Sequence, residues 1–139
     1  MESFIRSFEG CTLPASEWTH GKHLTMALWY LLRHPRDEAT RLIREGIQRY
    51  NLSTGNRTGY HETITLAWIA VISEFLENQV RSRPVAELAM ELDAACGQKD
   101  HLLRYYSRDR LFSSEARRRW VSPDLRPLQG PAKESPAPE

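Results

Sequence analysis

Apolar residues recur every three or four positions along four stretches of the chain, a spacing that predicts four amphipathic helices. The four stretches are 14–34, 36–50, 60–80 and 84–95. Pro35 separates the first two, because the residue before a proline disfavours the helical region. Gly97 follows the fourth stretch and is expected to close it as a C-cap. The polar loop 51–59 joins the second helix to the third.

The pattern loosens after the fourth helix, where shorter helical segments are expected at 99–107 and 113–120. Residues 121–128 contain two prolines and are expected to lie as extended chain on the body of the protein. No alternating apolar run is long enough to indicate a sheet. The sequence therefore predicts an all-α fold, an up-down helical bundle of four main helices with one or two short C-terminal helices. We expect a single helical domain over 1–129 and a disordered, Pro-rich tail over 130–139.

The composition is that of an ordinary soluble protein, with 40% apolar residues, 27% charged residues and a net charge of +1. No apolar run approaches the roughly 18–20 residues that span a bilayer. The N-terminus lacks the apolar core of a signal sequence. A net charge this small gives no overall field towards nucleic acid or membrane. We therefore expect a cytoplasmic protein with no nucleic-acid or membrane partner, and a homodimer stays open.

Three of the five histidines lie where predicted helices begin: His20 and His23 in the first, and His61 in the third. In an up-down bundle the first and third helices are parallel, so their first turns meet at one end. The turn at Gly97, which follows the fourth helix, is expected at the same end of the bundle. His20 shares a helical stripe with Leu24, and His61 shares one with Thr65 and Trp68 in the third helix. Connectivity thus predicts that the three imidazoles converge.

Three histidines with an open coordination position make a catalytic zinc arrangement. The same donors suit iron, and also nickel or copper, so zinc or iron is the expected metal. Glu17 and Glu62 are the candidate general bases, because each neighbours one of the histidines and a carboxylate takes a proton from metal-bound water. His101 and Cys11 stay open as further ligands. The alternative is a hydrogen-bonded structural cluster of histidines without metal.

Arginines gather after the fourth helix: residues 104–119 carry six of them against two acids. Arg108 and Arg117, with Tyr105 beside them, are the candidate substrate-binding residues, because guanidinium groups bind carboxylate or phosphate at two points. The alternative is a solvated basic surface. The sequence favours a metal-dependent enzyme, hydrolytic or oxygen-activating, that acts on a small anionic molecule. The rival hypothesis is a non-catalytic helical interaction module.

Overall fold

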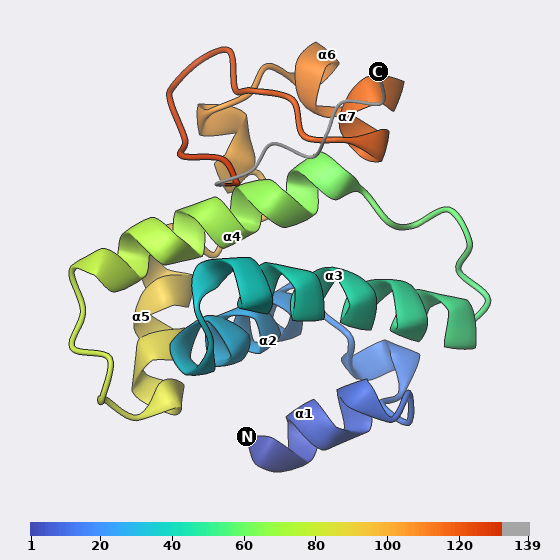
Figure 1. The fold of residues 1–139 in the computed structure, drawn as a ribbon, viewed down its shortest axis with the longest axis vertical. Helices are drawn as coiled ribbons and strands as arrows, with labels where there is room; N and C mark the ends of the chain where they lie inside the picture. The colour runs from blue at the N-terminus through green and yellow to red at the C-terminus, as the bar shows by residue number, and fades with distance from the viewer. Residues whose placement is uncertain (132–139) are drawn as a thin grey trace.

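All the regular structure in residues 1–131, the part of the chain that the computed structural model describes, is helical (Figure 1). The elements in chain order are α1 (Glu2–Glu9), η1 (Ala15–Glu17), α2 (His20–Arg33), α3 (Arg36–Ser53), α4 (Glu62–Glu77), α5 (Val85–Cys96), η2 (His101–Arg104), α6 (Arg108–Leu111) and α7 (Ser114–Arg118). The predicted all-α class is confirmed. The predicted up-down arrangement of four helices is not confirmed, and most of the predicted tail lies outside the described residues.

The first predicted helix divides into two elements. Residues 15–17 form the short 3-10 turn η1, and α2 begins only at His20. Thr19 is the N-cap of α2, and its hydroxyl oxygen accepts a hydrogen bond from the backbone N–H of Lys22 at 3.3 Å. The other main helices lie where the apolar spacing predicted them, within a few residues at each end.

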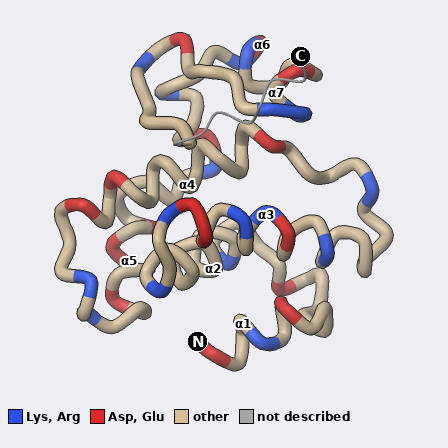
Figure 2. The backbone as a smooth tube through the Cα atoms, in the orientation of Figure 1, with Lys and Arg blue, Asp and Glu red and all other residues tan. Residues whose placement is uncertain are grey.

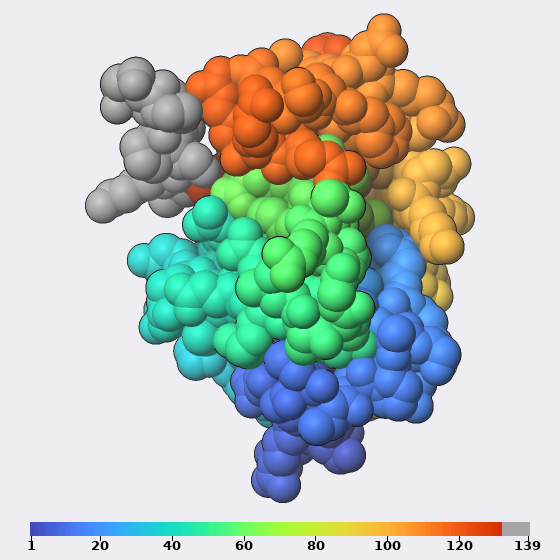
Figure 3. Space-filling view, turned by 90° about the vertical axis from the view of Figure 1, so that its right-hand side faces the viewer, coloured from blue at the N-terminus to red at the C-terminus, as the bar shows by residue number. Residues whose placement is uncertain are grey.

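The helices pack around α4 (Figure 1). Helices α2 and α3 run antiparallel below α4, because only a two-residue connection at His34 and Pro35 joins them. Helix α5 packs against α2, and α1 lies under α3, where the ring of Phe8 approaches so closely that a Cβ on Gly46 would come within 2.9 Å of it. The C-terminal segment with α6 and α7 covers the opposite side of α4, as the side view also shows (Figure 3).

Helix α4 is therefore buried from two sides, and its sequence is apolar nearly all round. No charged residue occurs between Glu62 and Glu74, so the centre of α4 appears uncharged in Figure 2. On the upper side, the hydroxyl of Thr63 donates to the Arg119 carbonyl at 2.6 Å and accepts from the Val121 N–H at 3.1 Å. These two hydrogen bonds attach the C-terminal segment to the first turn of α4.

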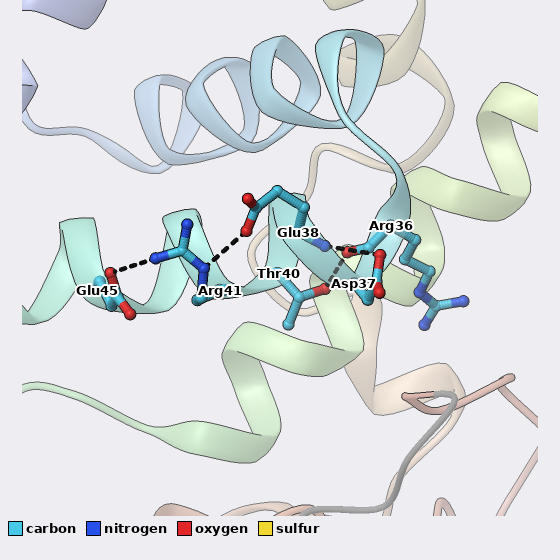
Figure 4. A network of polar contacts seen from close by, with 6 residues as sticks. All are labelled: Arg36, Asp37, Glu38, Thr40, Arg41 and Glu45. Carbon is cyan, nitrogen blue, oxygen red and sulfur yellow. Dashed lines mark hydrogen bonds and ion pairs between the residues drawn. The ribbon is translucent and has the colours of Figure 1, made fainter.

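Charged residues of both signs recur along α3 (Figure 2). Arg41 lies between Glu38 and Glu45 and pairs with both, at 2.7 Å and 3.0 Å (Figure 4). All three side chains are about half exposed. Such pairs contribute little to stability, because water competes for both charges.

Among residues 1–131, no helix combines the length and apolar character that crossing a membrane requires.

Candidate functional site

A partly open cavity of about 300 Å³ lies between α2, α3 and α4. Its walls are mainly apolar and comprise Leu24, Met26, Ala27, Ile43, Ile47, Ile64, Trp68 and Ile69. Its polar lining residues are His20, His23, Thr65 and Lys99. Within the described part of the chain no aspartate or glutamate lines it. The cavity therefore combines apolar walls with two imidazoles and one ammonium group.

His20 presents a buried polar atom that has no partner. Its Nε2 lies out of solvent and makes no hydrogen bond of ordinary geometry with any residue in the range 1–131, although the Gly97 backbone lies near the ring. The ring meets Trp68 edge to face at 5.0 Å between centroids. Burial lowers the pKa of His20; nearby Lys99 also lowers it, whereas the Gly97 backbone and Asp93 raise it. The ring is therefore neutral at pH 7 and costs free energy while its Nε2 stays unpaired.

His23 lies one turn further along α2 and also lines the cavity. Its Nδ1 is 2.7 Å from the Thr19 carbonyl oxygen, so Nδ1 carries the proton and Nε2 is left as an acceptor. The ring stacks on Trp18 at 3.8 Å between centroids. Burial lowers the pKa of His23, and the neighbouring His20 lowers it further. The structure thus brings His20 and His23 to one cavity, as the spacing predicted.

His61, the third histidine of the predicted cluster, does not line this cavity with His20 and His23. His61 is the N-cap of α4, and its Nδ1 accepts the Ile64 N–H at 3.1 Å. Its Nε2 therefore carries the proton and donates to the Leu111 carbonyl at 2.8 Å, on the side of α4 that α6 covers. Both ring nitrogens are used in these hydrogen bonds, which leaves no lone pair for a metal ion.

The predicted metal centre has no matching geometry in residues 1–131. Among these residues, no group of three or more histidine, cysteine, aspartate or glutamate side chains is placed to hold a metal ion. His101, one of the two open candidates, stacks on Trp68 at 5.8 Å between centroids rather than lining the cavity. Cys11, the other, directs its Sγ towards the Arg49 carbonyl at 3.8 Å.

The two candidate general bases do not face the cavity either. Glu62 is 3% exposed, and Arg44 binds both of its carboxylate oxygens, at 3.1 Å from Nε to Oε1 and 3.0 Å from Nη2 to Oε2. The Tyr60 hydroxyl donates to the same Oε1 at 2.5 Å. Glu62 is thus a buried carboxylate that Arg44 and Tyr60 hold with three hydrogen bonds. Glu17 lies exposed in η1 and does not line the cavity.

The candidate substrate-binding residues lie away from the cavity. Arg117 donates to the backbone carbonyls of Thr58 and Tyr60 and so holds the loop before α4. Arg108 is exposed on α6. Tyr105 lies beside His101, with 5.7 Å between ring centroids. None of the three lines the cavity, and substrate binding by these residues stays a prediction.

Sequence reasoning missed Lys99 and the α3 wall of the cavity. Lys99 follows the Gly97 turn, which connectivity predicted to return to this end of the helices, and that position was the available signal. Ile43 and Ile47 belong to the apolar stripe of α3, but a stripe predicts burial and not which part of it borders an open space.

Acid is expected to destabilise the fold before the carboxylates titrate. Burial lowers the pKa of His20, His23, His61 and His101 below the ordinary value of 6.5. The unfolded chain therefore binds more protons than the folded chain just below pH 6.5, so the stability present above pH 6.5 falls as the pH decreases. The exposed carboxylates with lowered pKa, such as Glu38, lose their contribution only below their ordinary value of 4.5.

Urea unfolding at pH 7.5 and pH 5.5 tests this expectation. We expect a lower midpoint at pH 5.5 with an unchanged slope. A His61→Asn variant should show a smaller fall, because one of the four histidines is removed. Equal midpoints at the two pH values would show that burial of these imidazoles is not linked to folding.

Comparison of the chain with protein-family models, with curated proteins and with solved structures finds no match. The choice of a function therefore depends on the geometry of the cavity.

Proposed function

We propose that this protein binds a small, largely apolar molecule that carries one hydrogen-bonding group, in the cavity between α2, α3 and α4. The observation that carries the proposal is the buried Nε2 of His20, which borders this cavity and has no hydrogen-bond partner among the described residues. A buried polar atom without a partner is costly, and at the wall of a mainly apolar cavity a bound ligand would supply the missing partner.

The size of the cavity indicates the size of the ligand. An apolar cavity of about 150 Å³ holds benzene. A cavity of about 300 Å³ therefore suits a molecule of roughly ten to twelve non-hydrogen atoms. The apolar walls would take the body of such a molecule, and His20 with His23 would bind its polar end.

The proposed role is binding and not catalysis. In the described residues, neither carboxylate expected to move a proton in a metal-dependent reaction lines the cavity: Glu62 is held by Arg44 and Tyr60, and Glu17 lies exposed in η1. Two ring nitrogens are sufficient to orient a ligand: the Nε2 of His23, which is an acceptor, and the unpartnered Nε2 of His20. Elemental analysis separates the two ideas: about one metal ion per chain, lost in His20→Ala, would favour the metal-dependent reaction instead.

Filling the cavity is expected to abolish binding without weakening the fold. Ala27 lines the cavity and is 5% exposed, so Ala27→Leu places three further carbons in the open space. We expect the free energy of unfolding to stay the same or rise by about 0.5–2 kcal/mol, as cavity filling usually does. Affinity for small apolar probes, measured by isothermal titration calorimetry, should fall below detection.

The matched control for Ala27→Leu is Ala86→Leu on α5, an exposed helical position away from this cavity, which should leave probe binding unchanged. Unchanged probe affinity in Ala27→Leu, with the fold intact, would contradict the proposed function. So would a drop in stability of several kcal/mol, because that result means that the space is already closed in solution.

A further inference from the structure

We infer that the ligand of this cavity is a monocarboxylate with a short apolar chain or ring, whose carboxylate pairs with Lys99 and with a protonated His20. The inference rests on the proposed function and adds the charge of the ligand to it. Within residues 1–131, the Lys, Arg, Asp and Glu residues that border the cavity reduce to one, the cationic Lys99.

Lys99 is the cationic residue among the lining residues, and no carboxylate lies among them in residues 1–131. Lys99 takes part in no ion pair with any described residue. An anionic ligand would gain a partner here, whereas an ammonium ligand would meet like charge. A neutral ligand would form no ion pair with the Lys99 ammonium group.

His20 supplies the second contact at this end of the cavity. Its unpartnered Nε2 and Lys99 both border the same space, and Lys99 lies close enough to lower the pKa of His20. A carboxylate between the two groups would reverse that effect, because a negative charge favours the imidazolium form. Binding would then favour the imidazolium form, in which Nε2 carries a proton and donates a charge-assisted hydrogen bond to the ligand.

The surrounding groups do not supply a competing anion inside the cavity. Asp93 on α5 raises the pKa of His20 but does not line the cavity. His23 on α2 is neutral and donates its Nδ1 proton to the Thr19 carbonyl. His101 lies behind the ring of Trp68. The residues that α3 and α4 contribute to the lining have no titratable side chain. His20 is therefore the group whose proton uptake we expect to accompany binding.

Three probes of equal chain length test the charge of the ligand: octanoate, octanol and octylamine, each titrated into the full chain by calorimetry. We expect octanoate to bind at least about tenfold more tightly than octanol at pH 6.5, as one charge-assisted contact would give. We expect octylamine not to bind. Octanoate titrations in buffers of different ionisation enthalpy should show uptake of up to one proton per ligand.

The pH dependence gives a second readout. Between pH 6.5 and pH 8.5 octanoate itself does not titrate, yet its dissociation constant should rise by up to about tenfold per pH unit, because one proton is linked to binding. The dissociation constant of octanol should not change over this range. In His20→Gln the slope for octanoate should vanish, and His34→Gln, at the opposite end of the same helix, should behave as the wild type.

Lys99→Met offers a variant at an exposed position, where folding is not at risk. It should weaken octanoate about tenfold and leave octanol unaffected. Equal affinities for octanoate and octanol, or tightest binding of octylamine, would overturn the inference and leave the proposed function standing. Failure of all three probes to bind would overturn both.

Discussion

Replacing Arg44 by alanine is expected to destabilise the protein by roughly 2–3 kcal/mol, because the substitution leaves the carboxylate of Glu62 buried without its cation. The side chain of Glu62 is 4% exposed, and both of its oxygens are bound by the Arg44 guanidinium. The usual loss for breaking a buried pair is about 3–5 kcal/mol. The lower value expected here reflects the Tyr60 hydroxyl, which continues to donate to Oε1, and the partial exposure of Arg44.

Arg41 provides the matched control on the same helix. It also pairs with two carboxylate oxygens, but those belong to exposed Glu38 and Glu45 (Figure 4). Arg41→Ala is expected to change the free energy of unfolding by less than about 1 kcal/mol. Chemical denaturation of both variants measures the difference. Similar losses for the two arginines would show that Glu62 is hydrated in solution.

A double variant at Arg44 and Glu62 identifies why Arg44→Ala lowers the free energy of unfolding. Glu62→Gln removes the buried charge but keeps a partner for Tyr60, so Arg44→Ala with Glu62→Gln should be more stable than Arg44→Ala alone. Additive losses would mean that Arg44 stabilises the fold through the packing of its side chain and not through its charge.

The periodicity of the apolar residues predicted the main helices because each packs one face against its neighbours. It did not predict where α2 begins, since Pro14 and Glu17 resemble the start of a helix while Thr19 supplies the cap that the structure uses. Nor did it predict α1. That helix is only eight residues long and is held by contacts distant in sequence, such as Phe8 against Gly46.

The arrangement of the helices was harder to predict than their positions, and α4 shows why. Its residues are apolar on nearly every side, a pattern that indicates burial from two directions. An up-down bundle has no second layer to provide that burial. The layer comes from the C-terminal segment, whose short helices α6 and α7 carry too few apolar residues for their own pattern to reveal it.

The candidate site was predicted only in part, because helical spacing governs the side chains within a helix but not at its N-cap. His20 in α2 and Thr65 and Trp68 in α4 line one cavity, as their helical stripes indicated. His61 was placed on the α4 stripe by counting back four residues from Thr65, yet its backbone dihedrals are φ −136° and ψ 112°. A cap residue lies outside the helix, so helical spacing does not govern the direction of its side chain.

Loss of His61 is expected to be the most damaging change to a single histidine. His61→Ala removes the N-cap of α4, a loss of about 0.5–2 kcal/mol. It also leaves the Leu111 carbonyl without its donor in a buried position, a loss of about 1–3 kcal/mol. We therefore expect a fall of roughly 2–4 kcal/mol in the free energy of unfolding, together with weaker attachment of the C-terminal segment to α4.

His61→Asn separates the two contributions, because asparagine is a good N-cap but its side chain is too short to reach Leu111. Its stability should fall between those of the wild type and His61→Ala. Hydrogen exchange localises the difference: amides at the first turn of α4 should lose protection only in His61→Ala, and amides of α6 and α7 in both variants. If instead a metal ion bound to His61 stabilised the fold, both variants would lose metal together with stability, and added chelator would destabilise the wild type to the same extent. The hydrogen bonds of His61 to Ile64 and Leu111 predict that chelator has no such effect.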